Sequence, residues 1–98
     1  MSSDINDDTP FGRILKYQAR RSENNPALHT ALIPGNASVM CVAFQFGCPT
    51  VWASVPPGEC EDTRQVTFVP TGGETSWGRY VGSLVTDAYV LHAFVETD

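Results

Sequence analysis

The sequence predicts an all-β domain, with six to seven short antiparallel strands in a small sandwich or a partly open barrel. Three observations predict this fold class. Short segments that are apolar, or in which apolar and polar residues alternate, recur along the chain. Turns rich in proline and glycine separate them, and little of the sequence has helical periodicity. The alternative is an α+β fold in which residues 11–20 form one N-terminal helix on the sheet.

The stretch at residues 38–57 predicts two central strands. Its first half places apolar side chains on both faces, which is typical of a strand that is covered on two sides. We expect a tight Gly-Cys-Pro turn at residues 47–49 between the two strands. A pair of prolines ends the second strand, because proline has no N–H to donate to a ladder. Trp52, in the second strand, is expected in the core.

Further strands are predicted at residues 12–20, 27–33, 64–69, 79–85 and 88–95. The segment at 64–69 alternates most regularly, with Val66 and Phe68 directed inward and Gln65 and Thr67 directed outward. One face of that strand should therefore be exposed to solvent. The last segment is apolar on both faces, like the central pair.

The length and the N-terminus predict the domain organisation and the location. The 98 residues suffice for one domain with a single modest core. Residues 1–11 are polar and are expected to form a disordered tail, which leaves residues 12–98 as one β-rich domain. We find neither the pattern of a signal peptide nor an apolar run that could cross a membrane. We therefore expect a cytoplasmic protein without membrane contact.

Composition also predicts which partners and cofactors to expect. Six basic residues stand against eleven acidic ones, which gives a net charge of -5 and argues against direct nucleic-acid binding. Three cysteines without CxxC spacing favour free thiols, and no paired Cys or His spacing indicates a metal site. We expect neither a metal nor another cofactor.

No catalytic constellation is recognisable, so we expect a protein that is not an enzyme. The chain has two histidines, His29 and His92, but no nucleophile elbow such as Gly-x-Ser-x-Gly. His92 lies within an apolar segment, where a neutral histidine bonded to a backbone group is the commoner arrangement.

A candidate site for a ligand or a partner lies around the glycine-rich segment at residues 71–78. Trp77, Arg79 and Tyr80 bring aromatic rings and a guanidinium next to an adaptable loop, which suits the stacking of a base and the binding of a phosphate. Arg64 joins them if its strand lies beside the strand of Arg79. In the alternative interpretation, Trp77 covers an edge of the core and both arginines pair with acidic residues at positions 59–62.

Several motifs follow one another in a characteristic order. They are CPTVWASVP at residues 48–56, a Thr71-Gly72 turn, the step Tyr80-Val81-Gly82-Ser83 and the ending Val90-Leu91-His92-Ala93-Phe94. In this order they resemble a family of small uncharacterised bacteriophage proteins, over about residues 27–95. The glycine-rich turn departs from the family pattern Gly-Thr-Gly-His, because this chain has Pro-Thr-Gly-Gly at residues 70–73. The resemblance implies a phage origin and action inside an infected bacterium.

Two functions of different classes follow from these observations. The first is a non-enzymatic inhibitor that binds a host protein, for example a bacterial defence protein. The second is a protein that sequesters a nucleotide-derived immune signalling molecule. A virion or assembly accessory role is a further alternative. An exposed edge strand near residues 13–19 or 64–69 would also allow a homodimer or a higher oligomer through sheet extension.

Overall fold

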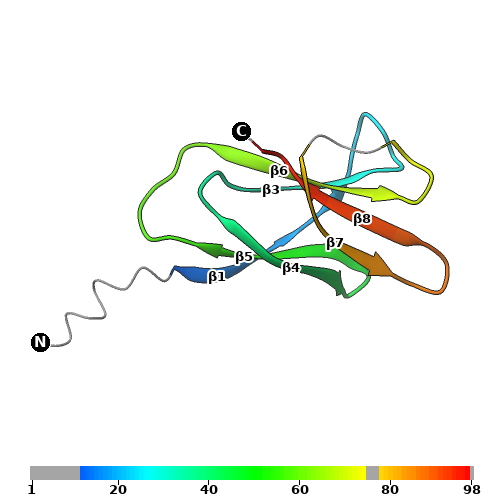
Figure 1. Cartoon of the computed structure of the whole chain (residues 1–98), viewed down its shortest axis with the longest axis horizontal. Coiled ribbons are helices and arrows are strands. Elements are labelled where there is room, and N and C mark those ends of the chain that lie inside the picture. The colour runs from blue at the N-terminus through cyan, green and yellow to red at the C-terminus, as the bar shows by residue number, and fades with distance from the viewer. Residues whose placement is uncertain (1–11, 75–77, 98) are drawn as a thin grey trace, which may run out of the picture.

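The computed structural model describes residues 12–74 and 78–97, which form eight strands in two antiparallel sheets (Figure 1). The strands are β1 (Arg13–Gln18), β2 (Arg20–Arg21), β3 (His29–Pro34), β4 (Ser38–Gln45), β5 (Cys48–Val55), β6 (Thr63–Pro70), β7 (Arg79–Val85) and β8 (Val90–Val95). This confirms the all-β prediction. The segment for which a helix at residues 11–20 was the alternative forms β1 and β2, so that alternative is wrong. The tail expected at residues 1–11 lies outside the described residues.

The two sheets face each other as a sandwich. One sheet has three strands in the order β1-β5-β4, and the other has five in the order β2-β3-β6-β8-β7. The chain passes from the first sheet to the second at the buried Ala19, whose N–H donates a hydrogen bond of 2.8 Å to the carbonyl of Pro49. This crossing closes one side of the sandwich. Its other side is closed where β4 lies against β7.

The core lies between the sheets and is built from alternating residues of both. Its largest fully buried side chains are Phe68, Ile33, Val51, Val66, Val95 and Thr50. Val66 and Phe68 thus point inward, as the alternation of β6 predicts. Burial of one such aliphatic or aromatic side chain contributes about 1.5–3 kcal/mol.

The hairpin between β4 and β5 turns one residue earlier than the sequence suggests. Gln45 and Cys48 face each other, so the turn consists of Phe46 and Gly47. Both residues have positive φ angles, 52° and 79°, as a two-residue type I′ turn requires. The expected turn at residues 47–49 was wrong because glycine takes the second turn position and proline is tolerated near the start of β5.

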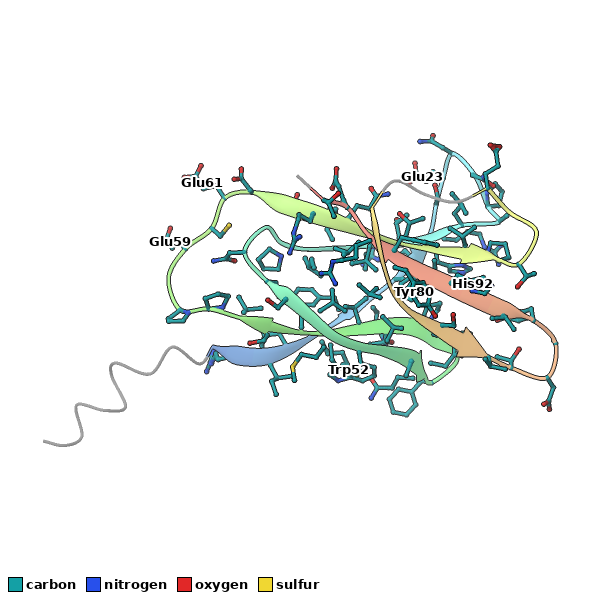
Figure 2. All side chains as sticks on the ribbon, viewed as in Figure 1. Glu23, Trp52, Glu59, Glu61, Tyr80 and His92 are labelled. Atoms are coloured by element: carbon teal, nitrogen blue, oxygen red, sulfur yellow. The ribbon has the colours of Figure 1, made fainter. Side chains whose placement is uncertain are left out.

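Three expectations about the positions of strands and side chains were also wrong. β4 is the edge of the three-stranded sheet, and Trp52 of β5 lies half-buried on the outer face of that sheet, away from the core (Figure 2). β6 is central between β3 and β8, and its outward Thr67 is only 5% exposed. An apolar pattern shows which faces can be buried, but the sheet order decides which element covers them.

A β-bulge shapes the edge strand β7. The register with β8 shifts between Tyr80 and Gly82. Gly82 has a φ of 150°, and a Cβ built on it would lie 2.8 Å from Cγ2 of Val42. Glycine at this position therefore permits the close approach of β4 to β7, and the bulge changes which β7 side chains share a face.

Candidate functional site

The structure separates the residues that were expected to form one site. Trp77 lies outside the described residues. Arg79 and Tyr80 begin β7 and are exposed. Arg64 lies on β6, and β8 runs between β6 and β7. The strands of Arg64 and Arg79 are therefore not neighbours, and Arg64 does not join Arg79 and Tyr80 as expected.

Arg64 instead makes contacts to the backbone. Its Nη2 donates a hydrogen bond of 2.5 Å to the carbonyl of Ala37, and its Nη1 lies 3.5 Å from the carbonyl of Glu96. Its Nε is buried without a partner. These contacts tie the start of β6 to the β3–β4 turn and to the end of β8. They give Arg64 a structural role and differ from the expected pairing with acidic residues at positions 59–62.

Tyr80 takes part in a chain of side-chain hydrogen bonds. Its hydroxyl lies 2.6 Å from Oγ of Ser83, and this Oγ lies 3.1 Å from Nδ1 of His92. Nε2 of His92 lies 2.8 Å from Oγ1 of Thr71, in the turn after β6. Two directions of donation satisfy the whole chain, from Tyr80 through Ser83 and His92 to Thr71 or the reverse, and each requires a different tautomer of His92. Figure 2 labels Tyr80 and His92 on the two neighbouring strands.

The bulge in β7 makes this chain possible. Residues three apart in a regular strand point to opposite faces. Here Tyr80 pairs with Phe94 and Ser83 pairs with His92, so the extra residue brings Tyr80 and Ser83 to the same face. The chain of hydrogen bonds therefore depends on backbone geometry as much as on the types of side chain.

Two apolar side chains lie on the same face as the hydrogen bonds. The ring of Tyr80 meets the ring of Phe94 at an angle of 64° with a centroid distance of 5.8 Å, and Val85 at the end of β7 is 73% exposed. Edge-on ring pairs contribute about 0.5–1.5 kcal/mol beyond area burial. We call this surface the β7–β8 face and define it by Thr71, Tyr80, Ser83, Val85, His92 and Phe94. It combines ordered polar groups with exposed apolar ones.

Sequence reasoning missed His92, Ser83 and Thr71 as members of a site. His92 was expected to bond to a backbone group, whereas both of its ring nitrogens contact hydroxyls of side chains. The motifs themselves held the signal, because every hydrogen-bonding member of the face belongs to the Thr-Gly turn, the Tyr-Val-Gly-Ser step or the last motif. Only the strand order shows that these motifs meet.

The pair of Ser83 and His92 differs from the arrangement of a serine hydrolase in the partner of the second ring nitrogen of the histidine. Oγ of Ser83 and Nδ1 of His92 are as close to each other as a nucleophile and its general base would be. In serine hydrolases, however, a carboxylate holds the second nitrogen of the base, whereas here that nitrogen contacts the neutral Thr71.

Within residues 12–74 and 78–97, we find no group of three His, Cys, Asp or Glu placed to hold a metal ion. The same residues contain no helix that is long and apolar enough to span a membrane.

The fold and this face define a small β-sandwich domain whose larger sheet carries an ordered polar and aromatic surface. The chain belongs to the family described as a domain of unknown function, DUF7352, whose family model matches residues 12–98. No curated protein matches the chain, and no solved structure does.

Proposed function

We propose that this chain is a non-enzymatic binding protein that recognises a partner protein through the β7–β8 face. The observation that carries the proposal is the state of Tyr80. Its side chain is 55% exposed, yet its ring rests on Phe94 and its hydroxyl is bonded to Ser83. Exposed side chains change rotamer readily, and these two contacts favour one position of the Tyr80 side chain.

The energetics of interfaces support this proposal. Tyrosine is among the residues that dominate binding energy at protein interfaces. Ordering a free side chain on binding costs about 0.5–1.5 kcal/mol, and a side chain that is already ordered avoids much of this cost. Val85 adds exposed apolar area at the other end of the same strand. The face thus offers a preorganised anchor and a separate exposed apolar side chain.

The resemblance to small bacteriophage proteins supports a more specific form of the proposal. In that form the protein acts in the cytoplasm of an infected bacterium, where it binds and inhibits a host protein, such as a defence protein. The resemblance rests on the motifs that supply the hydrogen-bonding members of the face. A virion or assembly accessory role would use the same surface on a phage partner.

The test is affinity capture from a bacterial lysate with the wild-type protein and two variants. Tyr80→Ala removes the anchor, whereas Tyr80→Phe keeps the ring and removes only the hydroxyl. We expect one dominant bacterial protein that is captured by the wild type, retained in part by Tyr80→Phe and lost with Tyr80→Ala. Equal capture by all three folded proteins would contradict the assignment of this face. Trp77→Ala tests whether the tryptophan expected from the sequence contributes.

A second candidate function is the sequestration of a nucleotide-derived signalling molecule. A cleft of about 610 Å³ that is lined by two basic side chains, Lys16 and Arg20, favours this function. Its volume falls in the range of about 300–1,000 Å³ that is common for small-molecule sites. Native mass spectrometry of gently purified protein tests this function, since a retained adduct of nucleotide size would support it and bare protein would contradict it.

We also propose a homodimer that forms through the free edge of β1. Among residues 12–74 and 78–97, β5 is the one strand that pairs with β1, and Ile14 and Leu15 are exposed along β1. An antiparallel pair of β1 strands centred between Leu15 and Lys16 would set Arg13 opposite Gln18 and so avoid opposing like charges. The other edge considered from the sequence, residues 64–69, is central in its sheet. Light scattering coupled to size exclusion decides between a dimer and the 10.7 kDa monomer.

A further inference from the structure

The cleft at the crossing from β1 to β2 lies apart from the β7–β8 face. Its lining residues are Lys16, Tyr17, Gln18, Ala19, Arg20, Leu32 and Cys48. A smaller adjoining hollow shares Gln18, Arg20 and Leu32 and adds Thr30. Both hollows lie where one strand leaves the three-stranded sheet and the next one joins the five-stranded sheet.

The alternation of the chain explains why polar groups gather in this cleft. Ala19 points into the core, so Gln18 and Arg20 on either side of it point outward. Lys16 shares the outward side, and its Nζ donates a hydrogen bond of 2.6 Å to Oε1 of Gln45. The crossing therefore carries Lys16, Gln18 and Arg20 on one side of the chain, and the ammonium of Lys16 also contacts Gln45 of β4.

Basic residues are concentrated at and next to this cleft, which favours an anion there. Four of the six basic residues, Arg13, Lys16, Arg20 and Arg21, lie within nine positions of a chain whose net charge is -5. No acidic residue occurs between positions 12 and 22, and no carboxylate lines the cleft. The acidic loop that carries Glu59 and Glu61 lies at one end of the molecule, and Glu23 lies in the loop after β2 (Figure 2). A local excess of positive charge attracts anionic ligands.

We propose that this cleft binds the phosphate groups of a small phosphorylated molecule such as a nucleotide. Arg20 supplies the planar fork that suits phosphate oxygens, and Lys16 supplies a second positive charge. Leu32, which is 60% exposed beside them, offers an apolar surface for the remainder of the ligand. The proposal rests on the second candidate function and gives it a location that differs from the one expected around Arg79 and Tyr80.

The experiment is calorimetric titration of the full chain with ADP and with inorganic pyrophosphate at low ionic strength. We expect saturable binding, with an affinity that falls by about tenfold or more in Arg20→Ala and in Lys16→Ala. Arg20→Lys should lose less, because it keeps the charge and removes only the fork. Arg79→Ala is the matched control, since it removes an exposed arginine from the far edge of the five-stranded sheet. Tighter binding of ADP than of pyrophosphate would support a contact of the nucleoside with Leu32.

The outcomes separate this proposal from the candidate function on which it rests. Binding that is lost in Arg79→Ala and kept in Arg20→Ala would overturn the cleft but retain a nucleotide-binding protein. Absence of saturable binding for both probes would overturn the proposed site, whereas the retained adduct in native mass spectrometry decides the second candidate function. Equal weakening in all arginine variants would indicate a nonspecific charge effect and would also overturn the site. The partner-binding role of the β7–β8 face is tested independently by the affinity capture.

Discussion

Ser83 on β7 and His92 on β8 lie opposite each other, with Oγ of Ser83 3.1 Å from Nδ1 of His92. Ser83 also holds the hydroxyl of Tyr80 at 2.6 Å, so it joins the exposed aromatic side chain to the histidine. This cross-strand pair is therefore the link on which the order of the β7–β8 face depends.

Removal of this link should destabilise the protein slightly and free Tyr80. We expect Ser83→Ala to lower the free energy of unfolding by about 1 kcal/mol, which is the usual net value of a hydrogen bond. Urea denaturation measures it. The double variant with Tyr80→Phe should cost less than the sum of the two single changes, because both remove the same bond. Strict additivity would show that the two hydroxyls act independently.

The turn at Phe46 and Gly47 predicts a stabilising substitution. Phe46 has a φ of 52° and is 89% exposed, so it bears the cost of a left-handed backbone without burying its ring. Asparagine tolerates this conformation and is preferred at this position of a type I′ turn. We expect Phe46→Asn to raise the free energy of unfolding by roughly 1 kcal/mol. Phe46→Ala, the control, should change the free energy of unfolding little. Destabilisation by Phe46→Asn would contradict the inference that the backbone at Phe46 is strained.

The two arginines of the expected site should respond differently to substitution. Arg64→Met removes the donor to the carbonyl of Ala37, and loss of a partner for a part-buried polar group costs about 1–3 kcal/mol. Arg79→Met removes an exposed side chain and should change stability by less than about 0.5 kcal/mol. Thermal unfolding of both variants measures the difference. Equal stability of the two variants would refute the structural role of Arg64.

The environment of His29 predicts that the protein is less stable at acidic pH. Burial, together with the positive charge of Arg21, lowers the pKa of His29 below the ordinary value of 6.5. The unfolded chain then binds a proton at a higher pH than the folded protein does, so the free energy of unfolding decreases as the pH falls below about 6.5. We expect the free energy of unfolding to decrease less between pH 7.5 and 5.5 in His29→Gln than in the wild type, and urea denaturation at both pH values measures this. An unchanged pH dependence would argue against this contribution.

The sequence by itself determined the fold class and most of the strands. The alternation of Val66 and Phe68 and the turns rich in glycine and proline are local signals, and they predict strands without knowledge of their neighbours. The position of Tyr80 beside Arg79 and the glycine-rich segment also led us to expect Tyr80 in a binding surface, which stays a prediction. Those expectations depended only on the order of residue types along short segments.

The tertiary structure alone decided which strands lie side by side. Strand order places β8 between Arg64 and Arg79, brings His92 to Ser83, and leaves Trp52 on an outer face. The bulge next to Gly82 is a further nonlocal feature, because it accompanies the close approach of β4 to β7. The physical reason is that strand pairing and sheet packing join segments far apart in the chain, whereas the apolar pattern specifies only which side of each strand can be buried.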